Sequence, residues 1–112
     1  MGKAQIEMAF RENCDDPGSL KSGEYLEERI LQTARRFVEQ DRNGLVQVLD
    51  EWLRERSEPR TMLAVSVAGH LRLAELRSAL HRLKTEIDSG RAFMKFYAGK
   101  VATALAQIDL PE

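Results

Sequence analysis

The sequence predicts an all-α fold, and three observations support this prediction. Apolar residues recur at steps of three and four along most of the chain, the spacing that gathers them on one helix face. No segment alternates apolar and polar residues between hairpin turns, so no strand is predicted. The 112 residues include only three prolines, and the breaks between periodic segments are short. We expect about five antiparallel helices, forming a single domain over residues 24–112.

The first 23 residues are expected to form an N-terminal segment and linker. A short helix over residues 3–12 would place Ile6 and Phe10 on one side, where they offer a candidate apolar contact to a partner. Residues 13–23 are dense in turn-forming and capping types, which predicts the linker. The chain has a single cysteine, Cys14, and this favours a reducing, cytoplasmic location.

The next two helices are predicted over residues 24–40 and 44–56. Asp41 or Asn43 is a candidate cap for the second of them. Each has one apolar stripe, and Trp52 is interpreted as a core anchor rather than a binding residue. The two stripes contain Leu26, Ile30, Ala34, Phe37 and Val38, and then Leu45, Val48, Leu49, Trp52 and Leu53.

The third helix is predicted to begin at Pro59, because proline is favoured at the first helical position, and to end near His70. No charged residue lies between Thr61 and Gly69, and apolar residues surround the helix axis. A helix that is apolar nearly all round is normally buried on several sides. We therefore expect this helix to be the central one.

The fourth and fifth helices are predicted over residues 73–87 and from just after Gly90 to about Ile108. The stripe of the fifth helix places Phe93 and Tyr97 in the core. Phe96 falls outside that stripe, so we expect it to be partly exposed and to form an interface.

Two runs of small residues resemble the first helix of a HEAT-like helical repeat. They are Ala64-Val65-Ser66-Val67-Ala68-Gly69-His70-Leu71 and Val101-Ala102-Thr103-Ala104-Leu105-Ala106-Gln107-Ile108. The period is near 34 to 37 residues, and the resemblance covers about residues 24–108. It implies a short helical array that binds other macromolecules across one face, without chemistry of its own. A plain helical bundle remains the alternative.

No catalytic, metal-binding or cofactor-binding pattern is found in the sequence. His70 and His81 are the only histidines, and a predicted turn separates them, so they share no metal-binding face. Neither a nucleophile–base arrangement nor a phosphate-binding glycine loop is present. We therefore predict that the protein is not an enzyme.

Basic residues on the fourth helix form the candidate interaction surface. Arg77, His81 and Lys84 fall on one side at i, i+4 and i+7, with Arg82 beside them. Arg91 and Lys95, expected at the start of the fifth helix, extend this stripe, and positive charge there opposes the helix dipole. The stripe is interpreted either as a solvated helix face or as a surface for an acidic partner or phosphates.

The resemblance to HEAT-like repeats implies a protein-interaction module, such as an adaptor, regulatory subunit or inhibitor. A formal net charge of -1 gives the molecule no general attraction to nucleic acid or anionic membranes. A nucleic-acid-binding helical domain that uses the basic face of the fourth helix is the alternative. We expect a protein partner, no membrane association and, as a further possibility, a homodimer.

Overall fold

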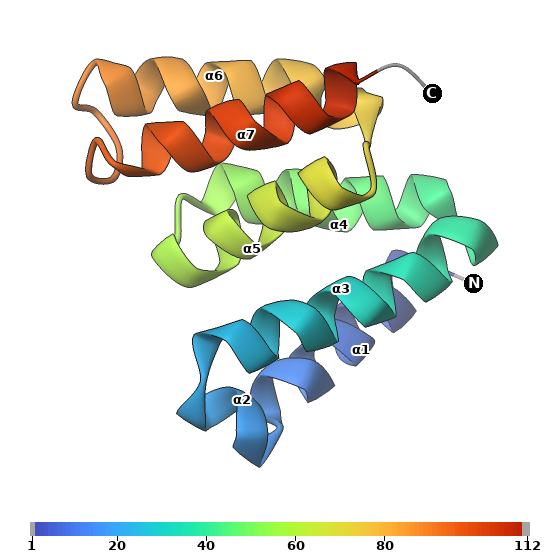
Figure 1. The fold of residues 1–112 in the computed structure, drawn as a ribbon. Coiled ribbons are helices and arrows are strands. Elements are labelled where there is room, and N and C mark those ends of the chain that lie inside the picture. The colour runs from blue at the N-terminus through green and yellow to red at the C-terminus, as the bar shows by residue number, and fades with distance from the viewer. Residues whose placement is uncertain (1, 111–112) are drawn as a thin grey trace. The chain divides into compact units, whose positions relative to one another are not determined.

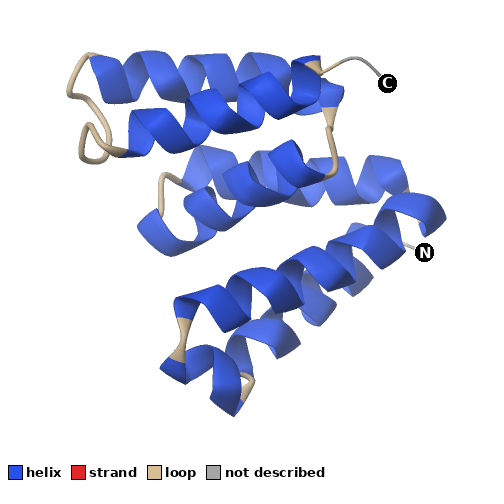
Figure 2. Cartoon of the chain, in the orientation of Figure 1, coloured by secondary structure: helices blue, strands red, loops and turns tan. Residues whose placement is uncertain are grey.

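The computed structural model describes residues 2–110, apart from the side chain of Leu20, and within this range the fold is all-α, as predicted (Figures 1 and 2). The described residues form no strand. The helices are α1 (Lys3–Asp15), α2 (Pro17–Lys21), α3 (Gly23–Gln40), α4 (Arg42–Glu55), α5 (Glu58–His70), the 3-10 turn η1 (Ala74–Leu76), α6 (Arg77–Asp88) and α7 (Tyr97–Asp109).

The chain divides into two compact units, Met1–Val48 and Leu49–Glu112. The boundary lies inside α4, whereas the sequence suggested a boundary at residue 23. Each unit is described by itself below.

Most of the expected linker in the first unit is helical. Residues 13–15 complete α1, and α2 occupies Pro17–Lys21. The turn-forming residues act as helix caps, because Asp16 Oδ1 accepts a hydrogen bond from Gly18 N at 2.8 Å and Ser22 Oγ accepts one from Tyr25 N at 3.2 Å. Residues that favour turns also cap helices, because their side chains accept hydrogen bonds from the free N–H groups at a helix start. The same residue types are therefore compatible with a new helix as well as with a loop.

The apolar face of α1 is buried within this unit. Ile6 and Phe10 are both 0% exposed, so the prediction that they offer a contact to a partner is wrong. Helix α1 packs against α3, whose own apolar face is also buried. The helix was predicted correctly, but its apolar face serves the core.

Asp41 caps α4, and it was one of the two residues predicted as the cap. Its Oδ1 accepts a hydrogen bond from Gly44 N at 3.0 Å. A Cβ atom at position 44 would lie 2.5 Å from Asp41 Oδ2 and 3.1 Å from Ile6 Cδ1, so glycine is needed for this close approach.

Helix α5 is the most deeply buried element of the second unit. Every residue from Thr61 to Gly69 is buried, which confirms the predicted burial on several sides. Helix α5 packs on α7, and α7 also packs on α6 (Figure 1). At the end of α5, a Cβ atom on Gly69 would lie 2.9 Å from Ala104 Cα, so the two backbones approach too closely for a larger residue.

An arginine follows the end of α4 directly and the end of α5 after one residue, each in the left-handed conformation for which glycine is usual. Arg56 has a φ of 55° and Arg72 a φ of 53°. After α5, Leu73 N donates to Ala68 O and Arg72 N donates to Gly69 O, the two bonds of a Schellman motif. The Arg72 guanidinium also donates to the carbonyl oxygen of Leu110. This contact links the end of α5 to the end of α7.

The fifth helix begins later than predicted. Helix α7 starts at Tyr97, and residues 89–96 form a loop. Gly90 has a φ of 79° and ends α6 in a second Schellman motif, while Phe93 has a φ of 50°, which no helix accommodates. Arg91 and Lys95 therefore lie in the loop, and the argument that their charges oppose a helix dipole is wrong.

The close approach at Gly69 predicts that Gly69→Ala destabilises the protein. The added methyl group meets backbone atoms of α7, which cannot rotate away, and overpacking of this kind costs about 1–3 kcal/mol. Gly99→Ala is the matched control, since nothing lies within 4 Å of a Cβ atom at that position in α7. We expect it to stabilise by roughly 0.5–1 kcal/mol, the usual gain over glycine within a helix.

Thermal or urea unfolding of both variants measures the two effects. Equal midpoints for Gly69→Ala and the unmodified protein would contradict the close helix contact.

Candidate protein-binding site

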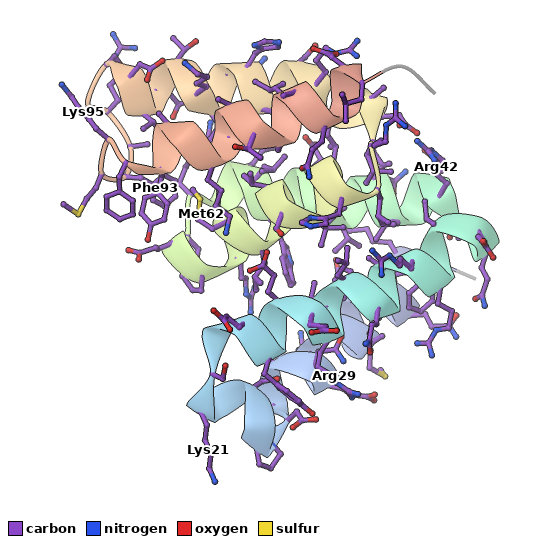
Figure 3. The ribbon with its side chains drawn as sticks, viewed as in Figure 1. Lys21, Arg29, Arg42, Met62, Phe93 and Lys95 are labelled. Carbon is purple, nitrogen blue, oxygen red and sulfur yellow. The ribbon has the colours of Figure 1, made fainter. Side chains whose placement is uncertain are left out.

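The loop between α6 and α7 carries two large apolar side chains that are open to solvent. Met94 and Phe96 are each 67% exposed. Lys95 lies between them in the chain, and Figure 3 shows its side chain extending away from the helices. Arg91 lies in the same loop and is also exposed. We call these four residues, Arg91, Met94, Lys95 and Phe96, the α6–α7 tip.

Backbone hydrogen bonds fix both ends of the loop that bears the tip. At its start, Arg91 N donates to Glu86 O at 2.8 Å, which completes the Schellman motif of α6. At its end, Tyr97 N donates to Met94 O and Ala98 N to Lys95 O, both at 3.0 Å. These bonds give the loop a defined path between the two helices.

Tyr97 anchors the tip to the start of α5. Its hydroxyl donates a hydrogen bond to Glu58 Oε1 at 2.6 Å, and this bond to a carboxylate raises the pKa of Tyr97 above its ordinary value of 10.0. Its ring contacts Phe96, with centroids 4.3 Å apart, and meets Phe93 edge-on at 5.9 Å. The aromatic rings therefore support one another at the base of the tip.

The exposure of these rings differs in part from the expectation. Phe96 is exposed, as expected, but Phe93 and Tyr97 are half-buried rather than core residues. Both were assigned to the apolar stripe of the fifth helix, but Phe93 lies in the loop before that helix begins. Trp52, in contrast, is a buried core residue, as predicted.

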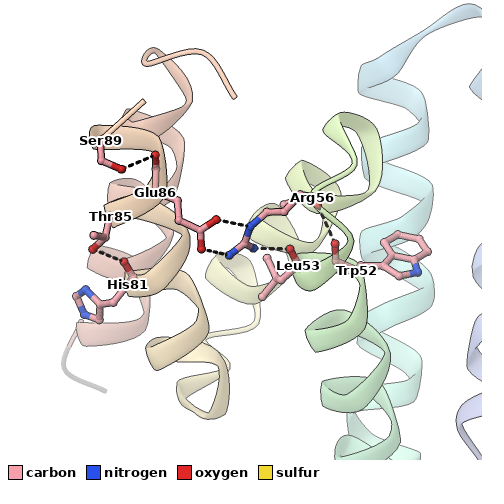
Figure 4. Close-up of polar contacts among 8 residues, drawn as sticks. Trp52, Leu53, Arg56, His81, Thr85, Glu86 and Ser89 are labelled. Atoms are coloured by element: carbon pink, nitrogen blue, oxygen red, sulfur yellow. Dashed lines mark hydrogen bonds and ion pairs between the residues drawn. The ribbon is translucent and has the colours of Figure 1, made fainter. Parts of the chain in front are cut away.

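A clamp between Arg56 and Glu86 fixes α6 to the end of α4 (Figure 4). Arg56 Nε donates to Glu86 Oε1 at 3.0 Å, and Arg56 Nη2 donates to Glu86 Oε2 at 2.6 Å. Arg56 Nη1 also donates to Leu53 O, one of the carbonyl groups that the end of α4 leaves without a helical partner. The hydrogen bonds from Arg56 are the main cause that lowers the pKa of Glu86 below 4.5.

The predicted basic stripe on α6 is largely compensated by carboxylates. Arg77 pairs with Asp109, and Lys84 pairs with Asp88 at 2.8 Å. His81 and Arg82 are exposed, and Figure 4 shows the His81 ring on α6 away from the Arg56 clamp. These pairs favour the interpretation of Arg77 and Lys84 as part of a solvated face. Arg91 and Lys95 form no ion pair with any residue in the range 2–110.

Residues 2–110 contain no group of three side chains suited to holding a metal ion. The His70 ring lies 2.9 Å from Ser66 O at the end of α5, which agrees with a structural role for this histidine. No helix in the described part of the chain is long and apolar enough to cross a membrane.

A polar cleft lies in each unit. The cleft in the first unit has a volume of about 280 Å³. Asn13 lines it, and the amide oxygen of that side chain is buried without a hydrogen-bond partner. The cleft in the second unit, about 170 Å³, lies beside the Arg56 clamp and is lined partly by Arg54, Glu75 and Arg82.

The chain was also compared with protein-family models, curated proteins and solved structures, and none of them matches it. The resemblance to HEAT-like repeats therefore stays a prediction.

Sequence reasoning missed Met94 and the two contacts that support the tip, Tyr97 to Glu58 and Arg56 to Glu86. Gly90 was the available signal, because glycine just after a helix commonly marks its end. Gly90 marked the end of α6, but it did not indicate that the next helix begins only at Tyr97 and that Met94 therefore lies in a loop. The two supporting contacts join residues 39 and 30 positions apart, beyond the reach of local pattern.

We predict that Glu86→Gln destabilises the protein by about 1 kcal/mol at neutral pH, the loss of a charge-assisted bidentate contact at a partly exposed site. Because folding lowers the pKa of Glu86, its contribution is complete above about pH 5. It is lost as the pH falls below 4.5 and through the folded-state pKa.

Unfolding midpoints between pH 3 and 7 test this dependence. The difference between the two proteins should be constant above about pH 5 and should shrink below 4.5. Glu28→Gln is the control, since Glu28 is exposed on α3 and makes no polar contact in the described chain. A difference for Glu86→Gln that does not change with pH would contradict the clamp.

Proposed function

We propose that this chain is a non-catalytic protein-interaction module that binds a protein partner through the α6–α7 tip. The observation that carries this proposal is the exposure of Met94 and Phe96, each 67%, on a loop whose two ends are hydrogen-bonded. Large apolar side chains placed together on a surface are typical of interaction sites, and aromatic residues are frequent among those that dominate binding.

Burial of these two side chains would supply a substantial part of a binding energy. Fully burying a methionine or phenylalanine side chain is worth about 1.5–3 kcal/mol. A loop that already has its bound shape loses less conformational entropy on binding than a flexible one. The hydrogen bonds at Arg91 and Tyr97 and the ring contacts of Tyr97 support such a preformed shape.

Two further features agree with the proposal. The resemblance to HEAT-like repeats implies a scaffold that binds macromolecules, and the tip connects two helices of the region that carries this resemblance. The single cysteine, Cys14, supports a reducing compartment such as the cytoplasm as the place of action.

The nucleic-acid alternative has less support. It depends on the basic face of α6, where Arg77 and Lys84 are paired with Asp109 and Asp88. A phosphate backbone would have to replace both carboxylates before it gained these two contacts.

Comparative affinity capture tests the proposal. Full-length tagged protein, the double variant Met94→Ser/Phe96→Ser and the control Met8→Ser are incubated with native lysate, with and without nuclease. Met8 is 62% exposed on α1, so its replacement changes surface polarity but leaves the tip intact. We expect a protein that is retained by the unmodified chain and the control, survives nuclease, and is reduced at least about tenfold with the double variant.

Equal retention of every captured protein by the double variant would contradict the proposal. Loss of the captured material after nuclease would instead favour nucleic-acid binding. Circular dichroism of each variant establishes that the helices are intact.

A further inference from the structure

The carboxylates near the α6–α7 tip are already engaged within the second unit. Asp88 pairs with Lys84, and Glu86 pairs with Arg56. Glu58 accepts a hydrogen bond from the Tyr97 hydroxyl, which is not a cation. The first two carboxylates are neutralised by cations, so they do not compensate the charges of the tip.

The cations of the tip, in contrast, are unpaired. Arg91 and Lys95 are exposed and have no ion-pair partner among residues 2–110, and the same holds for the half-buried Lys100 in the first turn of α7. Arg91 has only a longer-range attraction to Glu86. Together, the tip and the first turn of α7 carry three cations, and against the single charge of Glu58 they leave two positive charges in excess.

The start of α7 adds to this positive potential. Its first turn contains no acidic residue, and no side chain caps it. The N–H groups at a helix start carry a partial positive charge, which aspartate or glutamate normally offsets. Here the first turn contains Lys100 instead, which is unfavourable for the isolated helix and is relieved by an external carboxylate.

Charge and apolar surface alternate along the tip itself. Met94 and Phe96 stand on either side of Lys95 in the chain, and Arg91 lies a few residues before them. A ligand that fits this arrangement must bury apolar groups and place carboxylates beside them in the same contact.

We propose that the partner presents an acidic segment of polypeptide in which carboxylates flank one or more large apolar side chains. This inference rests on the proposed function and adds the chemistry of the partner to it. The apolar groups of the segment cover Met94 and Phe96, while its carboxylates approach Arg91, Lys95 and the start of α7.

A protein segment fits these observations better than a phosphate-bearing surface. A nucleic-acid backbone offers charge but no aliphatic group to cover Met94, and the net charge of the whole chain is -1. An anionic membrane normally attracts a cluster of several basic residues, whereas the tip has two cations and the first turn of α7 one.

Site-specific photo-cross-linking of the full chain in its native lysate tests this inference. The photoreactive residue p-benzoylphenylalanine replaces Phe96, which preserves an aromatic ring at the tip. The same replacement at Tyr25, which is 41% exposed on α3, is the position control. Mass spectrometry then identifies the cross-linked peptide.

A charge-reversal pair measures the electrostatic part of the contact. Arg91→Glu/Lys95→Glu is introduced beside the photoreactive residue and compared with Lys21→Glu/Arg35→Glu, which reverses two exposed charges in the first unit. We expect the cross-linked peptide to be acidic with apolar residues, and its yield to fall about tenfold with the first pair and less than twofold with the second.

The remaining outcomes separate the two proposals. A cross-linked protein segment that is neutral or basic, or a second copy of this chain, would overturn the acidic-segment inference and leave the interaction function in place. So would an equal yield from the two charge-reversed pairs. Cross-links to nucleic acid or lipid alone, or no adduct at position 96 beyond that at position 25, would overturn both.

Discussion

The close approach of α5 and α7 at Gly69 is the constraint on which the second unit depends. Since a Cβ atom at Gly69 would lie 2.9 Å from Ala104 Cα, only glycine allows the two backbones this separation. The contact sets the position of α7 beside a helix that is buried from Thr61 to Gly69. Glu58 at the start of α5 and Tyr97 at the start of α7 then come within hydrogen-bonding distance. The hydrogen bond between Tyr97 and Glu58 therefore depends on core packing farther along the same two helices, at Gly69 and Ala104.

Arginine side chains at helix ends extend this organisation. Arg56 and Arg72 both adopt positive φ values, which cost a residue with a side chain roughly 1 kcal/mol or more. Each guanidinium makes contacts that glycine could not make, Arg56 with Glu86 and Leu53 O, and Arg72 with Leu110 O. These contacts offset the strain and tie each helix end to another helix. The start of α7 has neither a capping side chain nor an acidic residue in its first turn.

The sequence predicted the fold well wherever periodicity was long and apolar. The buried faces of α4 and α6 and the all-round burial of α5 followed from spacing alone. In α3, Ile30, Ala34 and Phe37 are buried as predicted, whereas Leu26 and Val38 are half-buried. Ile6 and Phe10 were misassigned because periodicity shows that a face is apolar but not whether the same chain covers it. The start of α7 was misplaced because Phe93 and Tyr97 have the i, i+4 spacing of a helix, while Phe93 adopts a left-handed conformation that no local pattern reveals. The exposure of the tip residues therefore could not be predicted without the backbone path between Gly90 and Tyr97.

The proposed binding through Met94 and Phe96 requires that the loop between α6 and α7 has a fixed shape. Backbone ¹⁵N relaxation of the uniformly labelled protein tests it most directly, with residues 89–96 compared with the helices on either side. We expect order parameters near 0.85, the value of rigid backbone, through Phe93 and Phe96, together with coupling constants that give Phe93 a positive φ. Order parameters below about 0.6 over the loop would contradict it, because Met94 and Phe96 would then belong to a flexible connection rather than a preformed binding surface.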